Sequence, residues 1–288
     1  MNQSNLTNKL FPVIFLIIWS LGAIFTKLGL HYSSIWSFLF LRSSIALILL
    51  FLIIIFYRQK KDLFPKKEQI FKIIFTGLLL QFLYLVFYFY SIKTGISLGL
   101  VILVLGTQPL LTVFFNIKSL TLSKFLLVII SFAGLFITVT SYKSSNNFNL
   151  LGFIFSFIAL LSITTGTYLQ SKIHSNILSA LAIQTFITWL CFFIIILYSG
   201  LHVTWNISFI ASLLWMGGVV SVIAFLLLNY MLSKNTAENV SMLFLLLPIS
   251  TFILDAIIFK TPFPLTSMIG VLIVMVSVFI FQKKFRTN

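Results

Sequence analysis

The stretch 37–56, SFLFLRSSIALILLFLIIIF, consists of apolar and hydroxyl-bearing residues with one exception, Arg42. An α-helix needs about 20 apolar residues to cross the hydrocarbon core of a bilayer, so this stretch predicts a membrane-spanning helix. A guanidinium inside such a helix is costly, because hydrocarbon offers it neither water nor counter-ions. We therefore expect Arg42 to face the interior of a helix bundle, where an acid or a substrate can pair with it.

The composition of the whole chain agrees with a membrane protein. The 288 residues are 60% hydrophobic and only 8% charged, whereas a soluble domain carries about 25% charged residues. The net charge of +15 does not indicate nucleic-acid binding, because no basic cluster is interleaved with stacking aromatics. Cys191 is the only cysteine and the three histidines are isolated. No catalytic motif, metal site or cofactor is therefore expected, and the chain is not expected to be an enzyme.

Apolar runs long enough to span a membrane recur along the chain. Lipid offers the backbone no hydrogen bonds, so each run is expected to be helical. We predict an all-α membrane protein with ten spans, at residues 10–30, 35–57, 69–92, 97–116, 123–142, 150–171, 177–199, 206–231, 239–259 and 265–282.

An even number of spans places both termini on one side of the membrane, and the basic residues indicate which side. With the termini inside, the inner side holds Lys9, Arg58, Lys60, Lys61, Lys66, Lys67, Lys72, Lys118, Lys124, Lys172, Lys234, Lys283, Lys284 and Arg286. The outer side holds Lys27, Lys93, Lys143 and Lys260. Positive residues concentrate in cytoplasmic loops. The sequence therefore predicts a multi-pass protein of the bacterial inner membrane with both termini in the cytoplasm.

The two halves of the chain resemble each other. YSIKTGISLGLVILVLGTQPLL begins at residue 90 and YMLSKNTAENVSMLFLLLPIS begins at residue 230. Each contains a tyrosine, a lysine, a turn and an apolar helix with a proline. We predict two five-helix repeats, 1–143 and 144–288. Because five is odd, the second repeat enters the membrane from the opposite side, and such inverted repeats are typical of secondary transporters.

The order of these segments resembles the EamA family of the drug/metabolite transporter superfamily. The resemblance covers the whole chain and includes WSLGAIFTKLG in the first span, FLFLRSSIALILL in the second and the two Tyr…Pro segments. The segments SLTLSKFLLVIISFAGLFI and PFPLTSMIGVLIVMVSVFI, which close the two halves, also match. The resemblance implies gradient-linked movement of small metabolites, without indicating which one.

Arg42 has two interpretations, which the sequence leaves equal. Asp255 is the only acid expected at depth in the membrane, so Arg42–Asp255 is the only ion pair expected between buried groups. In the structural interpretation the pair is permanent. In the functional one Arg42 holds a substrate carboxylate, while Asp255 binds an amine or carries a coupling proton.

Polar and aromatic residues in other spans complete the predicted site. Gln81, Tyr84 and Tyr88 have helical spacing for one face. The predicted substrate-binding residues are Trp19, Ser20, Arg42, Gln81, Tyr84, Tyr88, Gln108, Thr164, Tyr168, Gln184, Thr188 and Trp215. Each amide alone is more readily explained by hydrogen bonding between helices, whereas the residues together outline a polar and aromatic cavity. Pro109 and Pro248 are candidate gating residues, and plain packing kinks are the alternative.

These residues predict a carrier that works by alternating access. Its expected substrate is an amino acid or an amphipathic organic cation, and export is expected from the family resemblance alone. The alternative substrate is S-adenosylmethionine or a nucleoside-type metabolite, imported or exchanged. A lipid-handling or accessory membrane protein without its own cavity is the alternative from another class. The expected partners are a small solute, lipids and a proton or other coupling ion, with the protein a monomer or a homodimer.

Overall fold

A computed structural model describes residues 3–56, 64–94, 101, 104–114, 121–141, 149–247, 249–250 and 265–285. These residues are helical apart from connecting turns, and a single antiparallel bridge pairs Ser33 with Val203. The chain divides into two compact units. Unit 1 comprises 1–82 and 172–233, and unit 2 comprises 83–171 and 234–288. This division by packing differs from the division into repeats 1–143 and 144–288, which stays a prediction.

Seven helices in the described residues are long and apolar enough to cross a membrane. They correspond to the predicted spans that begin at residues 10, 35, 69, 150, 177, 206 and 265. The span predicted at 123–142 corresponds to the helix Leu122–Ser141, whose stretch Leu122–Thr138 is a shorter apolar segment than the seven. The spans predicted at 97–116 and 239–259 lie partly outside the described residues. An all-helical, multi-pass architecture is therefore confirmed, and the count of ten spans stays a prediction.

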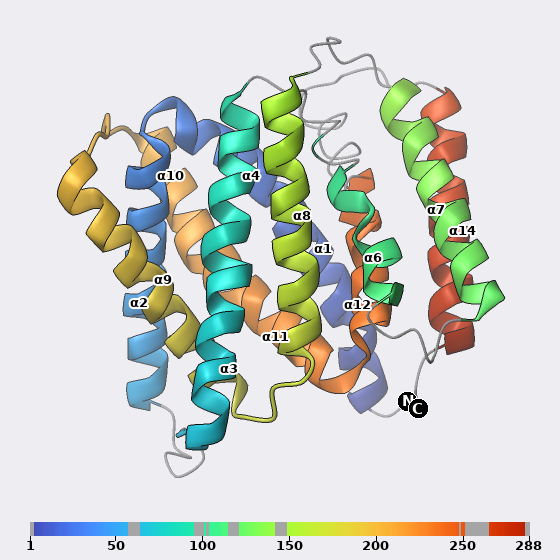
Figure 1. Cartoon of the computed structure of the whole chain (residues 1–288), viewed down its shortest axis with the longest axis horizontal. Helices are drawn as coiled ribbons and strands as arrows, with labels where there is room; N and C mark the ends of the chain where they lie inside the picture. Colours follow the sequence, from blue (N-terminus) through green and yellow to red (C-terminus); the bar gives the residue numbers. More distant parts are fainter. Residues whose placement is uncertain are drawn as a thin grey trace. The chain divides into compact units, whose positions relative to one another are not determined.

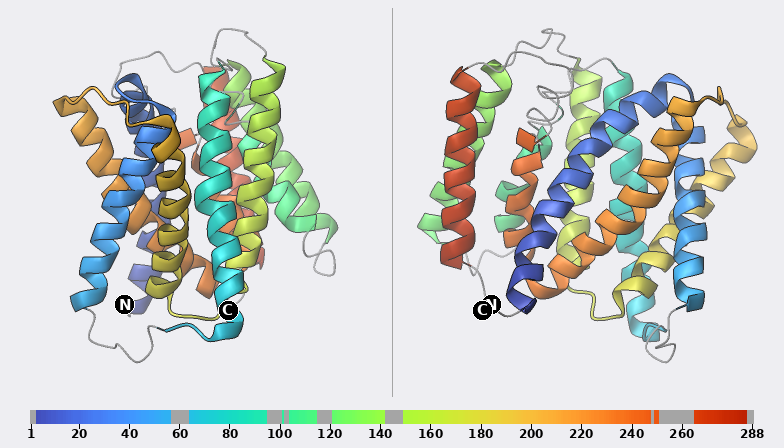
Figure 2. Two further views of the ribbon diagram at one scale, coloured as in Figure 1. Left: turned by 60° about the vertical axis from the view of Figure 1, so that its left-hand side comes forward. Right: turned by 180° about the vertical axis from the view of Figure 1, so that it is seen from behind.

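Unit 1 is built from helices of both sequence halves. Its helices are α1 (Gln3–His31), α2 (Ile35–Phe56), α3 (Lys67–Gly77), η2 (Leu78–Leu83, up to Phe82), α9 (Ile177–Ser199), α10 (Ile207–Leu214), η4 (Trp215–Ala224) and α11 (Phe225–Lys234, up to Ser233). Helix α2 packs against both α9 and η4, and α3 packs against α9. Seen from behind in Figure 2, α1 runs alongside α10 and η4, which it contacts.

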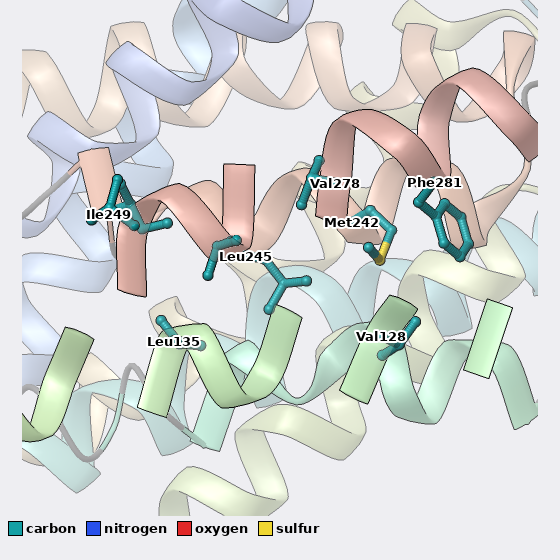
Figure 3. Packing of buried hydrophobic residues seen from close by; sticks show 9 residues of the cluster. Val128, Leu135, Met242, Leu245, Ile249, Val278 and Phe281 are labelled. Atoms are coloured by element: carbon teal, nitrogen blue, oxygen red, sulfur yellow. The ribbon is translucent and has the colours of Figure 1, made fainter. Parts of the chain in front are cut away.

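Unit 2 contains the remaining helices. They are α4 (Tyr84–Lys93), α6 (Gln108–Phe114), α7 (Leu122–Ser141), α8 (Leu150–Gln170), α12 (Ala237–Phe244) and α14 (Leu265–Phe285). Figure 1 shows two close pairs, α4 beside α8 and α7 beside α14. Apolar side chains from α7, α12 and α14 form its buried core, which includes Val128, Met242 and Phe281 (Figure 3).

Side-chain caps fix where several helices of the second half begin. The side-chain oxygen of Asn149 accepts from the backbone N–H of Gly152, and that of Asn206 accepts from Phe209. Asn176 and Thr236 cap α9 and α12 in the same way. The first N–H groups of a helix have no partner within it, so a cap satisfies them where the chain enters the apolar region.

Glycines allow α7 and α14 to approach each other closely. A Cβ atom added to Gly134 would lie 2.9 Å from the carbonyl oxygen of Gly270, and one added to Gly270 would lie 2.6 Å from that of Gly134. Small residues at such crossings are a common basis of helix association in membranes, where packing rather than the hydrophobic effect drives contact. The two glycines therefore allow the α7 and α14 backbones to pack directly against each other.

We predict that Gly270→Ala destabilises the protein. Its methyl group has no room against the α7 backbone, and overpacking of this kind costs about 1–3 kcal/mol. The measurement is the temperature at which the detergent-purified protein loses its monodisperse peak on size-exclusion chromatography after heating. Gly22→Ala is the matched control, because its nearest neighbours lie at an ordinary 3.5 Å. Equal midpoints for the two variants would contradict this prediction.

Candidate functional site

Arg42 is held at the junction between α2 and η4 in unit 1. Only 3% of its surface is exposed, although it lies in the middle of an apolar span. Its Nε donates a hydrogen bond of 2.7 Å to the hydroxyl oxygen of Ser221. That hydroxyl in turn donates to the carbonyl oxygen of Met216 at 2.8 Å. A chain of two hydrogen bonds thus ties the guanidinium to the backbone of η4.

The geometry of η4 and a glycine make this junction possible. Element η4 is a π-helix, which is rare and frequently found at functional sites. Ser221 reaches the carbonyl five residues earlier, in keeping with the wider turn. Gly217 lies directly against α2, since an added Cβ would be 2.9 Å from the Arg42 carbonyl oxygen. The α2 and η4 backbones are therefore close enough for a short serine to reach the arginine.

Three other predicted residues lie in the helices next to Arg42. Ser20 of α1 is 1% exposed. Trp19 packs between Phe15 and Phe225, with ring centroids 5.1 and 5.4 Å away. Trp215 of η4 stacks on Phe25 at 5.1 Å, and its buried indole nitrogen has no hydrogen-bond partner among the described residues.

A second polar group of unit 1 lies between α9 and the α3–η2 helix. It contains the predicted residues Gln81, Gln184 and Thr188, all at most 6% exposed. The hydroxyl of Thr185 donates to the side-chain oxygen of Gln81 at 3.1 Å. Thr76 is fully buried and directly precedes Gly77, which lies against Gln184. Thr76, Thr185 and Ser221 are not among the predicted residues, because their only signal in the sequence is a hydroxyl within an apolar run.

The remaining described site residues belong to unit 2. The rings of Tyr84 and Tyr88 stack with centroids 5.8 Å apart, so these two share a face as their spacing predicts. Gln81 lies in the π-helix η2, where bonding from i to i+5 alters the spacing that the prediction assumed. Thr164 is buried and its hydroxyl donates to the Leu160 carbonyl, and Tyr168 is half-buried on the same helix.

Gln108 and Pro109 lie where the fourth predicted span is interrupted. A turn at Thr107 precedes α6, which begins at Gln108, so Pro109 occupies the first helical turn, where no N–H is needed. The Gln108 amide nitrogen donates to the Thr167 hydroxyl at 3.4 Å. Asp255 and Pro248 lie outside the described residues. Proton coupling by Asp255 and gating by the two prolines stay predictions.

An ion pair that was not predicted lies in unit 2. Lys124 of α7 and Glu238 of α12 form an ion pair of 2.7 Å, with side chains 12% and 6% exposed. The ring of Phe285 lies 5.4 Å from the Lys124 ammonium and 5.5 Å from that of Lys284. The sequence places Glu238 at a helix end, which is correct, but burial there depends on α7 and α14 packing over it.

The sequence profile of the EamA-like transporter family matches twice, over residues 9–140 and 148–282. A solved crystal structure has a TM-score of 0.77 with 15% sequence identity, and the match covers 93% of this chain and 94% of that one. At that identity the likeness shows the fold alone. No curated protein matches the sequence. The described residues contain no cluster of His, Cys, Asp and Glu that could hold a metal ion.

We predict that Ser221→Ala destabilises the protein, because Arg42 loses a hydrogen bond inside the membrane. Bonds to charged groups contribute about 1.5–3 kcal/mol. The midpoint of thermal unfolding of purified protein measures the effect. Ser212→Ala is the control, since that buried hydroxyl bonds only to its own helix, at Ser208. If Ser221→Ala and Ser212→Ala lowered the thermal midpoint equally, the Arg42–Ser221 bond would contribute nothing specific to stability.

We predict that Lys124 and Glu238 are energetically coupled. Removing one charge leaves the other buried and uncompensated, which costs about 3 kcal/mol, whereas removing both is close to neutral. Lys124→Met and Glu238→Gln should therefore each lower the thermal midpoint. The double variant should recover most of the loss. A double variant that shows the sum of the two single losses would indicate independent side chains.

Proposed function

Because the chain belongs to the EamA-like transporter family, we propose that it is a secondary carrier for a small metabolite that bears a carboxylate. An amino acid is the proposed substrate. The carrier works by alternating access in the bacterial inner membrane and moves its substrate outward. Both termini are cytoplasmic in this proposal, which the strong bias of basic residues toward one side supports.

The burial of Arg42 carries the proposal. A carrier of the EamA family moves small molecules, and this one keeps a permanent positive charge inside an apolar span at a cost of about 2.5–3.5 kcal/mol. Arginine presents a planar fork of donors that matches a carboxylate, and it stays charged when buried. Charge-assisted bonds of this kind are strong in a medium of low dielectric constant. Such a group suits a site that must select a carboxylate.

The way Arg42 is anchored supports a binding role. Its Nε is engaged by Ser221, which fixes the plane of the guanidinium relative to η4. The two Nη groups of an arginine can bind both oxygens of a carboxylate end-on, in a bidentate geometry that does not use Nε. An orientation fixed in advance lowers the entropy lost on binding. The anchoring bond to a π-helix also gives the site an element that is commonly functional.

The charge of Arg42 disfavours the other expected substrate class. An amphipathic organic cation would meet like charge beside η4, and such repulsion works against binding. S-adenosylmethionine carries a carboxylate as well as a base, so it satisfies the same arginine and is the second candidate. The paired rings of Trp19 with Phe225 and Trp215 with Phe25 supply aromatic surface in the same unit.

We predict that ligand-induced thermal stabilisation depends on Arg42. A ligand that binds only the folded protein raises its stability by about 2.7 kcal/mol at 100 times its Kd. The panel contains the common amino acids, S-adenosylmethionine, nucleosides and quaternary amines, applied to purified wild type, Arg42→Lys and Arg42→Gln. Carboxylate ligands should stabilise the wild type, stabilise Arg42→Lys less, and leave a folded Arg42→Gln unchanged.

Two results would overturn this function. If Arg42→Gln keeps the response to carboxylates, Arg42 is not the clamp. If no ligand stabilises the wild type and proteoliposomes show no exchange of labelled amino acids, an accessory or lipid-handling role replaces the carrier. Ser212→Ala is the control variant with an unchanged response, because its hydroxyl bonds within its own helix.

A further inference from the structure

The Arg42 junction has a counterpart within unit 1. Helices α4 and α11 occupy corresponding places in the two halves of the sequence. They begin at residues 84 and 225 and end at residues 93 and 234, a shift of 141 residues at both ends. Helices α2 and α9 begin at a shift of 142 (35 to 177), which relates Arg42 to Gln184. The π-helices η2 and η4 occupy corresponding places, each directly before one of the first pair. The first junction, where α2 contacts η4 at Arg42, therefore has a counterpart. This second junction is the place where α9 contacts α3 and η2 at Gln184.

The two junctions share their packing. At the first, Gly217 lies against the α2 backbone at Arg42. At the second, Gly77 lies against the α9 backbone, since an added Cβ would be 2.8 Å from the Cα of Gln184. Each glycine brings a helix that contains a π-segment close to a helix that carries a long polar side chain. The counterpart of the arginine is a neutral amide.

Contacts made by neighbouring residues on the same helices place Thr76 and Thr188 inside the second junction. On α9, Thr188 follows Thr185, which bonds to Gln81, and precedes Phe192, whose ring packs on Phe82 at 5.2 Å. Thr188 therefore faces η2 from within a continuous contact. Thr76 directly precedes Gly77 and is fully buried.

Polar atoms of this junction lack a hydrogen-bond partner among the described residues. They include the hydroxyl oxygens of Thr76 and Thr188 and the amide nitrogen of Gln81. Buried hydroxyls in other helices, such as those of Thr138 and Ser156, donate to a carbonyl four residues earlier. Thr76 and Thr188 forgo that bond, although an unmet polar group in an apolar medium costs about 2–7 kcal/mol. Groups left in this state mark a place where a ligand can satisfy them.

The chemistry of the junction defines the ligand. Thr76, Gln81, Gln184, Thr185 and Thr188 are all uncharged. A threonine hydroxyl can donate and accept, and an amide N–H donates. With the oxygen of Gln81 engaged by Thr185, that side chain presents its N–H groups, which disfavour a cation. The fitting partner is a neutral group that both accepts and donates, such as a carboxamide or a hydroxyl.

We propose that Thr76, Gln81 and Thr188 form a second binding subsite, which takes an uncharged carboxamide or hydroxyl group of the transported solute. Taken with the proposed function, on which this substrate class rests, the subsite names an amino acid with a neutral polar side chain. Arg42 binds the carboxylate, and its counterpart junction binds the side chain. An amino acid with an apolar side chain of the same shape lacks the bonds and leaves three polar atoms unmet.

The test compares ligands of equal shape on purified protein by thermal shift over a concentration series. Asparagine is paired with leucine, and threonine with valine. Asparagine amide and leucine amide form a third pair that lacks the carboxylate. The proteins are wild type, Thr188→Val, Thr76→Val, Arg42→Gln and the control Thr138→Val, whose hydroxyl bonds to its own helix at Gly134.

The expected result is a preference that depends on the subsite alone. Wild type and Thr138→Val should bind asparagine and threonine roughly fivefold more tightly than leucine and valine, as one lost hydrogen bond implies. Thr188→Val and Thr76→Val should reduce this ratio of affinities to near one. They should not weaken the binding of the ligands leucine and valine. Without ligand, their thermal midpoints should stay equal to wild type or rise, because valine removes an unmet hydroxyl.

Failure of the subsite and failure of the proposed function give different results. The subsite is overturned if wild type shows no preference within the pairs, if Thr188→Val keeps the preference, or if ligand-free Thr188→Val is less stable than wild type. The carboxylate clamp is overturned if Arg42→Gln binds all four amino acids normally or wild type binds none. If wild type binds none of the amino acids, asparagine amide and leucine amide decide the fate of the subsite. A preference for asparagine amide that Thr188→Val abolishes would uphold the subsite. No such preference would overturn it.

Discussion

The absence of water in the hydrocarbon core governs this protein. Every buried polar group there must find its partner within the protein. Serine and threonine hydroxyls in the helices mostly meet this demand locally, as Thr164 and Ser212 do on their own backbone. Arg42 cannot do so, and its bond to Ser221 needs a second helix. The charged residue therefore determines how α2 and η4 meet.

Glycines and π-helices make the polar contacts of unit 1 possible. Gly217 and Gly77 remove the side chain that would separate two backbones. Short polar residues such as Ser221 and Thr185 then reach a side chain on the neighbouring helix. The same combination occurs at both junctions, once beside the charged side chain of Arg42 and once beside the neutral side chain of Gln184. A carrier can use such a difference to bind the two ends of one small solute.

The site was only partly predictable from the sequence. Buried amides and hydroxyls at Gln81, Gln184 and Thr188 could be recognised because polar residues are rare within apolar runs. The π-helix η2 that contains Gln81 could not be predicted, because a π-segment has no reliable signature in a single sequence. Burial of Glu238 also escaped prediction, since nothing in the local sequence shows that α7 and α14 cover it.

The sequence by itself determined the all-helical, membrane-spanning character. The length of an apolar run is a local property, and it can be compared directly with the thickness of the hydrocarbon core. It also determined the family, through segments in both halves. The partners of the buried charges were decided only by the tertiary structure. Arg42 and Ser221 are 179 residues apart, and Lys124 and Glu238 are 114 apart. Hydrogen bonds act over about 3 Å, so which distant groups pair is determined by how the helices pack.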